Sequence, residues 1–262
     1  WLNRGEHQEP DHEDLDEAIK EIHRDNRRCY GTRRQKLELE KNGFRVGRRT
    51  IAQRMRRLGL KVRYPKAFRK TTESDPSATF APNILDRNFR PEHPNQAWCG
   101  DITYVKTSGG FLYLAVVIDL HSRMIVGWSI QDNMRAGLVD EDLRMALGRR
   151  DVKPGLIFHS DRGSQYTSAK FRETCAQAGI IQSMSRKGNC WDNAVSESFF
   201  STIDRELLSD GRSWSPSRST LEIVTYIETY YNRRRLHSTL GYQSPLEFER
   251  KALRNAASQK AA

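Results

Sequence analysis

The strongest constraint on the fold is one run of seven residues, Leu114 to Leu120, in which only Asp119 is polar. A nearly continuous apolar run is typical of a central strand that is covered on both faces. Shorter β-rich runs lie on either side of it, at residues 102–105 and 124–130. A hairpin signal, Ser108-Gly109-Gly110, separates the first two runs. The sequence therefore predicts three antiparallel strands with a buried strand in the middle.

The segment that follows alternates between helix and strand patterns. Helical spacing of apolar residues extends over residues 136–147, 168–178 and 192–208, and strand patterns over 155–160 and 180–184. A strong helix pattern spans residues 220–232, and a short helix is expected from Pro245. Together these elements predict an α/β domain.

Three acidic residues belong to the predicted strands and helices of this domain. Asp101 precedes the first β-rich run, Asp161 follows the strand at 155–160, and Glu197 lies on the helix at 192–208. Converging carboxylates are what a pair of Mg²⁺ ions needs, because hard cations prefer oxygen ligands. Taken singly, each acid fits a solvated cap or a turn former better than a metal ligand. Nearby acids of that ordinary kind are Asp119, Asp132, Asp192 and Glu206.

Longer sequence words surround these acids and connect them to a known family. The words are Asp101–Tyr104, Asp119–Arg123, His159–Tyr166, Lys187–Cys190 and Tyr231–His237. In this order, from about Tyr30 to about Arg250, they closely resemble the transposases of bacterial insertion sequences that have a retroviral-integrase-like catalytic core. More narrowly, they resemble the downstream reading-frame product of the two-frame class.

The resemblance implies a fold and a domain organisation. The fold would be α/β, with a ribonuclease-H-like mixed five-stranded sheet and flanking helices, preceded by a small all-α helix-turn-helix-like domain. In that topology the strands carrying Asp101 and Asp161 are neighbours. We expect a DNA-binding domain at residues 1–62, a Pro-rich linker at 63–96, the catalytic core at 97–250 and a tail at 251–262.

The resemblance also implies the site. In the family, two Asp and one Glu with 35 residues between the last two are catalytic metal ligands, and here these are Asp101, Asp161 and Glu197. Two Mg²⁺ ions per active site would be held, with Mn²⁺ as a substitute, and Asp101 would be shared between them. The chain departs from the family at one position. The family usually has a basic residue seven positions after the Glu. Here Asp204 takes that position, and three alternatives follow: the adjacent Arg205 replaces the basic residue, recognition of the DNA end is weakened, or this copy is inactive.

Residues around these acids have local interpretations of their own. We expect Asp192 to cap the helix that it begins. His159 fits a hydrogen-bonded core residue better than a metal ligand. Arg162, Gln165, Asn189 and Asn193 are candidates for substrate contacts.

Positive charge is concentrated near the N-terminus. Residues 24–70 hold 18 Lys or Arg against 3 acids, whereas residues 71–262 hold 24 against 22. Three short helical patterns lie in or beside this block, and the last one, at 48–58, is rich in arginine. Such a unit fits a helix-turn-helix that binds DNA, and the alternative is a basic bundle that touches only the backbone. The sequence does not separate base readers from phosphate binders.

Basic residues of both domains make up the expected DNA contacts. The run Arg233–Arg235 fits either a solvated helix end or a clamp on the DNA backbone. The candidates are Arg48, Arg49, Arg54, Arg56, Arg57, Arg162, Lys187, Arg205, Arg233, Arg234 and Arg235.

Other classes of protein are disfavoured. No apolar run approaches the roughly 20 residues of a membrane span. The four cysteines form no C-x-x-C pair, so we expect isolated thiols in a bacterial cytoplasm, with the protein on the nucleoid when it binds DNA. The chain begins at Trp1 without a methionine, which indicates a trimmed or internal start.

The function implied by the resemblance is DNA transposition. It consists of metal-dependent cleavage at the 3′ ends of the element followed by strand transfer. Expected partners are the terminal inverted repeats, target DNA, at least one further copy of the chain and an upstream reading-frame protein. Two alternatives stay open, namely a DNA-binding regulator with an inactive catalytic fold and a simple metal-dependent nuclease.

Overall fold

The structure is a computed structural model that describes residues 12–63, 80–186, 189–211 and 213–260. The chain divides into two units, Trp1–Lys66 and Ala67–Ala262. Within the described residues no helix is both long enough and apolar enough to cross a membrane.

The first unit contains three helices, α1 (His12–Asp25), α2 (Thr32–Lys41) and α3 (Arg48–Arg57). Its core is formed by apolar residues at helical spacing, including Leu15, Ile19, Leu39 and Ile51, all at most 1% exposed. The predicted stop after α2 is confirmed, since Gly43 has φ +87° and Phe44 N–H donates to the Leu39 carbonyl at 2.9 Å. This is the three-helix arrangement that the sequence predicted.

The second unit is built on a five-stranded sheet in the order β3-β2-β1-β4-β5. Its strands are β1 (Ala97–Thr107), β2 (Gly110–Asp119), β3 (Ile125–Gln131), β4 (Ile157–Ser160) and β5 (Ile181–Met184). Strand β2 pairs antiparallel with both β1 and β3, whereas β4 pairs parallel with both β1 and β5. The predicted topology is confirmed, and β1 extends beyond the predicted residues 102–105 at both ends.

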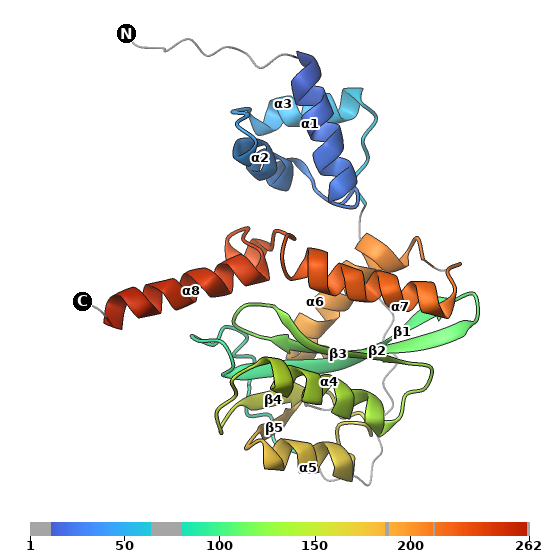
Figure 1. The fold of residues 1–262 in the computed structure, drawn as a ribbon, viewed down its shortest axis with the longest axis vertical. Helices are drawn as coiled ribbons and strands as arrows, with labels where there is room; N and C mark the ends of the chain where they lie inside the picture. The colour runs from blue at the N-terminus through green and yellow to red at the C-terminus, as the bar shows by residue number, and fades with distance from the viewer. Residues whose placement is uncertain (1–11, 64–79, 187–188, 212, 261–262) are drawn as a thin grey trace. The chain divides into compact units, whose positions relative to one another are not determined.

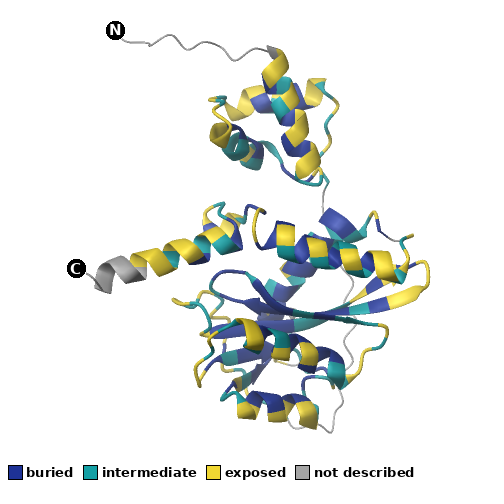
Figure 2. Cartoon of the chain, viewed as in Figure 1, coloured by how far each residue is buried: buried dark blue, intermediate teal, exposed yellow. Residues whose placement is uncertain are grey.

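Strand β2, which lies between β3 and β1, is largely buried and contributes to two cores (Figure 2). Leu114, Val116 and Ile118 belong to the core shared with α6 (Ala194–Ile203) and the region of α7 (Pro216–Thr225). The alternate residues Ala115 and Val117 belong to the core shared with α4 (Ala136–Arg149) and α5 (Ala169–Gln177). Helices therefore cover both faces, as the apolar run predicted (Figure 1).

The prediction of one regular helix over residues 192–208 is wrong. A 3₁₀ turn η1 (Cys190–Asn193) precedes α6, and a π-helical turn η2 (Asp204–Leu208) follows it. The helix α7 likewise continues as a π-helical segment, η3 (Tyr226–Tyr231). After the short turn η4 (Ser238–Leu240), helix α8 (Pro245–Lys260) extends through most of the segment expected to be a tail.

A buried ion pair holds η2 in place. The Glu206 carboxylate accepts hydrogen bonds from Arg235 Nε at 2.9 Å, Arg235 Nη2 at 2.9 Å and Tyr226 Oη at 2.8 Å. Glu206 is 1% exposed and Arg235 is 3% exposed. Glu206 is thus a structural acid, and the guanidinium of Arg235 faces the core instead of a ligand.

Residues 83–89, which lie in the expected linker, are packed on the second unit. The Ile84 and Leu85 N–H groups donate to Ser183 Oγ at 2.9 and 3.0 Å, and Leu85 is 3% exposed. Cys29, Cys99 and Cys175 are buried thiols that form no disulfide with one another.

Candidate active site

Asp101 and Asp161 lie at the same end of two adjacent parallel strands. Cys99 on β1 is in register with His159 on β4. Asp101 lies two residues after Cys99, and Asp161 lies two residues after His159. Both acids therefore lie just beyond the residues that pair β1 with β4. Because the strands are parallel, both carboxylates emerge at the same edge of the sheet.

The Asp101 carboxylate is surrounded by like charge. Burial raises its pKa well above the usual range, and the charges of Asp161 and Glu197 raise this pKa further. Hydrogen bonds from Ile102 N–H at 2.8 Å and Asn193 Nδ2 at 2.8 Å lower it. The two strongest charges acting on Asp101 are therefore both negative, and a divalent cation between the carboxylates would relieve the repulsion.

The turn that carries Asp161 is fixed by a close approach of the backbone. Gly163 N–H donates to Asp161 Oδ1 at 2.9 Å. A Cβ at position 163 would lie 3.0 Å from both Asp161 Oδ1 and Gln165 Oε1, so a side chain there would push the carboxylate aside. Glycine at position 163 therefore leaves room for the Asp161 carboxylate where it lies.

Glu197 lies in the first turn of α6, and its helix is tied to the strand of Asp101. Ser196 Oγ donates to Cys99 Sγ at 3.3 Å, and Phe199, Phe200 and Ile203 are buried against the sheet. The residue next to Ser196 is thereby held near the sheet edge, where its charge acts on Asp101.

The three acids interact electrostatically but do not form a finished ligand set. Among the residues that the structure describes, no three His, Cys, Asp or Glu side chains are grouped closely enough to hold a metal ion. Asp101 and Asp161 each have an oxygen engaged by a backbone N–H. Carboxylate oxygens are the donors that Mg²⁺ prefers, so the chemistry of the site fits that ion, and side-chain rotation is needed to complete it.

Asn193, which the sequence offered as a candidate substrate contact, is in direct contact with Asp101. It is 8% exposed, donates from Nδ2 to Asp101 Oδ2, and its Oδ1 is buried without a hydrogen-bond partner among the described residues. Asn193 precedes Glu197 by four residues. That spacing brings two side chains onto one helical face and could have indicated the contact.

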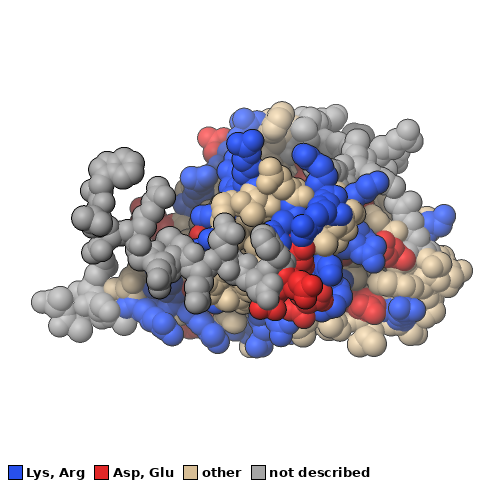
Figure 3. Space-filling model, turned by 90° about the horizontal axis from the view of Figure 1, so that it is seen from above, with Lys and Arg blue, Asp and Glu red and all other residues tan. Residues whose placement is uncertain are grey.

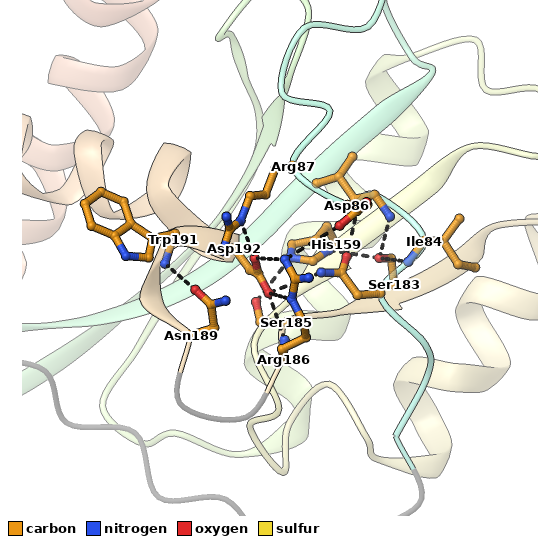
Figure 4. A network of polar contacts seen from close by, with 12 residues as sticks. Ile84, Asp86, Arg87, His159, Ser183, Ser185, Arg186, Asn189, Trp191 and Asp192 are labelled. Atoms are coloured by element: carbon orange, nitrogen blue, oxygen red, sulfur yellow. Dashed lines mark hydrogen bonds and ion pairs between the residues drawn. The ribbon is translucent and has the colours of Figure 1, made fainter.

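Asp192 does not cap α6, so that prediction is wrong. Its carboxylate accepts from Asn83 Nδ2 at 3.2 Å, Arg87 Nε at 2.9 Å and three nitrogens of Arg186 at 2.9 to 3.0 Å (Figure 4). The Arg186 hydrogen bonds are the main cause of its lowered pKa. Asp192 therefore joins residues 83–87, the end of the β5 segment and the start of α6. The side chain that accepts at the start of η1 is Asn189, from Trp191 N–H at 3.2 Å.

His159 is a core residue, as expected. Its ring nitrogens lie 2.9 Å from Ser183 Oγ and 3.1 Å from Ser185 Oγ, and it is 1% exposed (Figure 4). Burial lowers the pKa of His159 to about 4, so the ring is neutral near pH 7.

The candidate DNA contacts of the first unit fall into two groups. Arg48, Arg49 and Arg56 are exposed on α3. Arg54 is buried and donates to Asp16 Oδ1 at 2.8 Å, and the exposed Arg57 pairs with the same carboxylate. Lys and Arg side chains are spread over the face drawn in Figure 3, and Asp and Glu side chains cover less of it.

The candidate DNA contacts of the second unit also differ in whether they are exposed or held by other groups of the fold. Arg233 and Arg234 are exposed after η3. Arg162 Nε donates to the Ser185 carbonyl at 2.8 Å, and its guanidinium lies 4.7 Å from the centre of the Phe80 ring. Arg205 is 19% exposed and pairs with Glu206 at 3.3 Å. Lys187 lies outside the described residues.

Family models match nearly all of this chain. Two models, each described as an integrase core domain, match residues 91–190 and 178–245. A third, described as an HTH-like domain, matches residues 10–68.

Several known proteins are similar over nearly their full length. The transposase for insertion sequence element IS904 of Lactococcus lactis is 40% identical, over 93% of this chain and 96% of that protein. An uncharacterized 31 kDa protein of insertion element IS600 from Shigella sonnei is 42% identical, over 98% and 96%. The transposase InsF of IS3A from Escherichia coli is 40% identical, over 86% and 78%.

Solved structures of viral integrases are similar in fold. A chain of the simian T-cell lymphotropic virus intasome, solved with a PP2A regulatory subunit, matches with a TM-score of 0.51 at 15% identity, over 88% of this chain and 74% of that one. The HTLV-2 integrase catalytic core domain, solved in complex with magnesium, has a TM-score of 0.47 at 16% identity, over 61% and 99%.

Proposed function

The chain belongs to the IS3 family of insertion-sequence transposases, which have an integrase core domain, and we propose that Asp101, Asp161 and Glu197 carry its DNA cleavage and joining. The reaction would be metal-dependent cleavage at the 3′ ends of the element, followed by attack of each 3′-OH on a target phosphodiester.

One observation carries the assignment of the acids. Burial and the charges of both Asp161 and Glu197 raise the pKa of Asp101, although the three residues come from strand β1, the turn after strand β4 and helix α6. Folding has thus brought together like charges that repel one another without a cation. Such an arrangement destabilises the fold, and it is explained if the acids serve as ligands.

The roles of the individual residues follow from their positions. Bound Mg²⁺ would act as a Lewis acid on the phosphate and would activate the attacking oxygen. Asp101, whose carboxylate responds to the charges of both other acids, would be shared by two ions, with Asp161 completing one site and Glu197 the other. The backbone N–H groups of Ile102 and Gly163 help to orient the carboxylates of Asp101 and Asp161.

The first unit would bind DNA. Within it, residues 24–66 hold 16 Lys or Arg against 3 acids, which suits a polyanion, and Arg48, Arg49 and Arg56 offer exposed guanidinium groups on α3. We assign residues 1–62 to DNA binding, 63–96 to a linker that is partly docked on the core, 97–250 to catalysis and 251–262 to a tail. Arg233 and Arg234 are further candidates, whereas Arg54 and Arg235 are assigned to the fold.

The partners would be the element's two terminal inverted repeats and target DNA, in a bacterial cytoplasm. Holding two ends together requires at least two copies of the chain, and an upstream reading-frame protein would add to end binding.

The experiment supplies Mg²⁺ or Mn²⁺ with a duplex that ends in the element's terminal repeat. Joined products support the proposal, cleavage alone supports a simple nuclease, and binding alone supports a regulator. The Asp161→Asn variant is expected to lose both reactions and to keep DNA binding. Asp132→Asn, which changes an exposed acid outside the group, serves as the matched control and is expected to react normally. If the Asp161→Asn variant joined DNA at the wild-type rate, the assignment of Asp161 as a catalytic metal ligand would be wrong.

A further inference from the structure

Trp191 is an aromatic side chain that the fold leaves in solvent beside the candidate active site. It is 70% exposed, more than any other large apolar side chain in the described part of the chain. Trp98, in contrast, is completely buried. In Figure 4 the indole points away from the polar network around Asp192.

Hydrogen bonds hold the backbone on both sides of Trp191. Its own N–H donates to Asn189 Oδ1 at 3.2 Å. The next residue, Asp192, is buried and accepts five hydrogen bonds from Asn83, Arg87 and Arg186. The segment that carries the indole is therefore fixed in place by this network.

Trp191 is also two residues away from a residue that contacts one of the acids. Two residues further on, Asn193 turns inward and bonds Asp101 at 2.8 Å. Two Cα steps span at most about 7.6 Å. The short turn η1 therefore directs one side chain into the site and another out beside it.

The surroundings of the indole suit a nucleotide better than a protein surface. Among the described residues, no other large exposed apolar side chain lies within nine positions of it in the sequence, and the nearby Asn189 is polar. Arg87 and Arg186, which hold Asp192, are 45% and 48% exposed and bring positive charge nearby. A flat apolar ring beside cationic groups matches a base and its phosphate.

We propose that Trp191 stacks on an unpaired nucleobase next to the reacting phosphate. This inference rests on the proposed function, because it assumes that DNA enters the site. Aromatic side chains bind unpaired bases through their π-faces with little regard to sequence. At a DNA end a base leaves its pair at small cost, so stacking on Trp191 would hold the end open and fix the position of the phosphate.

The test is a double-mutant cycle between Trp191 and single bases of the DNA. The full chain and its Trp191→Ala variant are assayed for joining in Mg²⁺ on duplexes that end in the terminal repeat, with one abasic residue at each of the last positions in turn. Trp191→Ala is expected to slow joining by about five- to hundredfold on intact DNA. At one position the abasic residue should slow the wild type similarly and the variant no further.

Two variants provide controls. Trp191→Phe keeps a stacking ring and is expected to retain most activity. Leu221→Ala removes an apolar side chain that is 66% exposed on α7 and is expected to have no effect.

Three results would overturn the inference. In the first, Trp191→Ala joins intact DNA at the wild-type rate. In the second, abasic residues slow wild type and variant by equal factors at every position. In the third, Trp191→Ala changes the oligomeric state in light scattering without DNA, which would assign the indole to a contact between copies. A wild-type chain that neither cleaves nor joins would instead reject the proposed function, and this inference with it.

Discussion

Replacing Glu206 by Gln is expected to lower the thermal stability of the second unit strongly while leaving its chemistry intact. The substitution keeps the side-chain shape but removes the charge that faces Arg235. Arg235 is 3% exposed and loses the carboxylate that accepts from its Nε and Nη2 at 2.9 Å. Removing one partner of a buried ion pair costs roughly 3–5 kcal/mol. For a unit of this size, that corresponds to a fall in Tm of roughly 6–20 °C.

The matched control is Glu197→Gln, the same substitution nine residues earlier on the same helical segment. Glu197 adds to the repulsion on Asp101, so its neutralisation is expected to leave the Tm unchanged or higher and to abolish DNA joining. Glu206→Gln should show the reverse, with a low Tm but metal-dependent joining at a temperature where it is folded.

Thermal melts followed by circular dichroism check both variants, and their pH dependence provides a second test. Folding lowers the pKa of Glu206 because Arg235 and Tyr226 outweigh the effect of burial. An acid whose pKa is lowered stabilises the fold above its ordinary value, here 4.5, and this stability is lost as the pH falls towards the lowered pKa. The Tm difference between wild type and Glu206→Gln should therefore narrow below pH 4.5. A Tm within about 2 °C of wild type at pH 7 would refute the reasoning.

Four further outcomes are expected. Mg²⁺ should raise the Tm of the wild type but not of Asp101→Asn, because only a cation that binds the folded state stabilises it; equal shifts would contradict the metal assignment. Asn193→Ala should slow joining about tenfold with little change in DNA affinity, measured by single-turnover kinetics and anisotropy. Asp192→Asn should cost about 1–3 kcal/mol in chemical denaturation, less than Glu206→Gln because Arg186 can turn to water. Removing residues 1–66 should flatten the salt dependence of DNA binding, and an unchanged slope would exclude that unit as the main phosphate contact.

Residue patterns were sufficient for the framework of the fold. Leu114 to Leu120 is apolar on both alternating faces, and such a strand has to be covered by helices on each side, as the two cores around β2 confirm. The Ser108-Gly109-Gly110 turn predicted the β1–β2 hairpin for the same local reason. The acids were selected through sequence words that resemble a family, because a single Asp has no pattern of its own.

Contacts between distant residues could not be predicted in this way. Asp192 has the sequence position of a helix cap, but Arg87, which is 105 residues away, and Arg186 bind its carboxylate instead. Arg235 belongs to a basic run that looks like a DNA contact, and only its packing against Glu206, 29 residues away, shows that it is structural.

The sequence by itself determined the order of strands and helices along the chain, since helix and strand periodicities depend on residues a few positions apart. The tertiary structure decided which charged groups are used inside the fold and which stay available at its surface. Arg54 pairs with Asp16 across 38 residues, whereas Trp191 stays in solvent between neighbours that are held in place. Whether a charge is neutralised or a ring is buried depends on what the folded chain brings within a few ångströms of it, and local sequence does not contain that information.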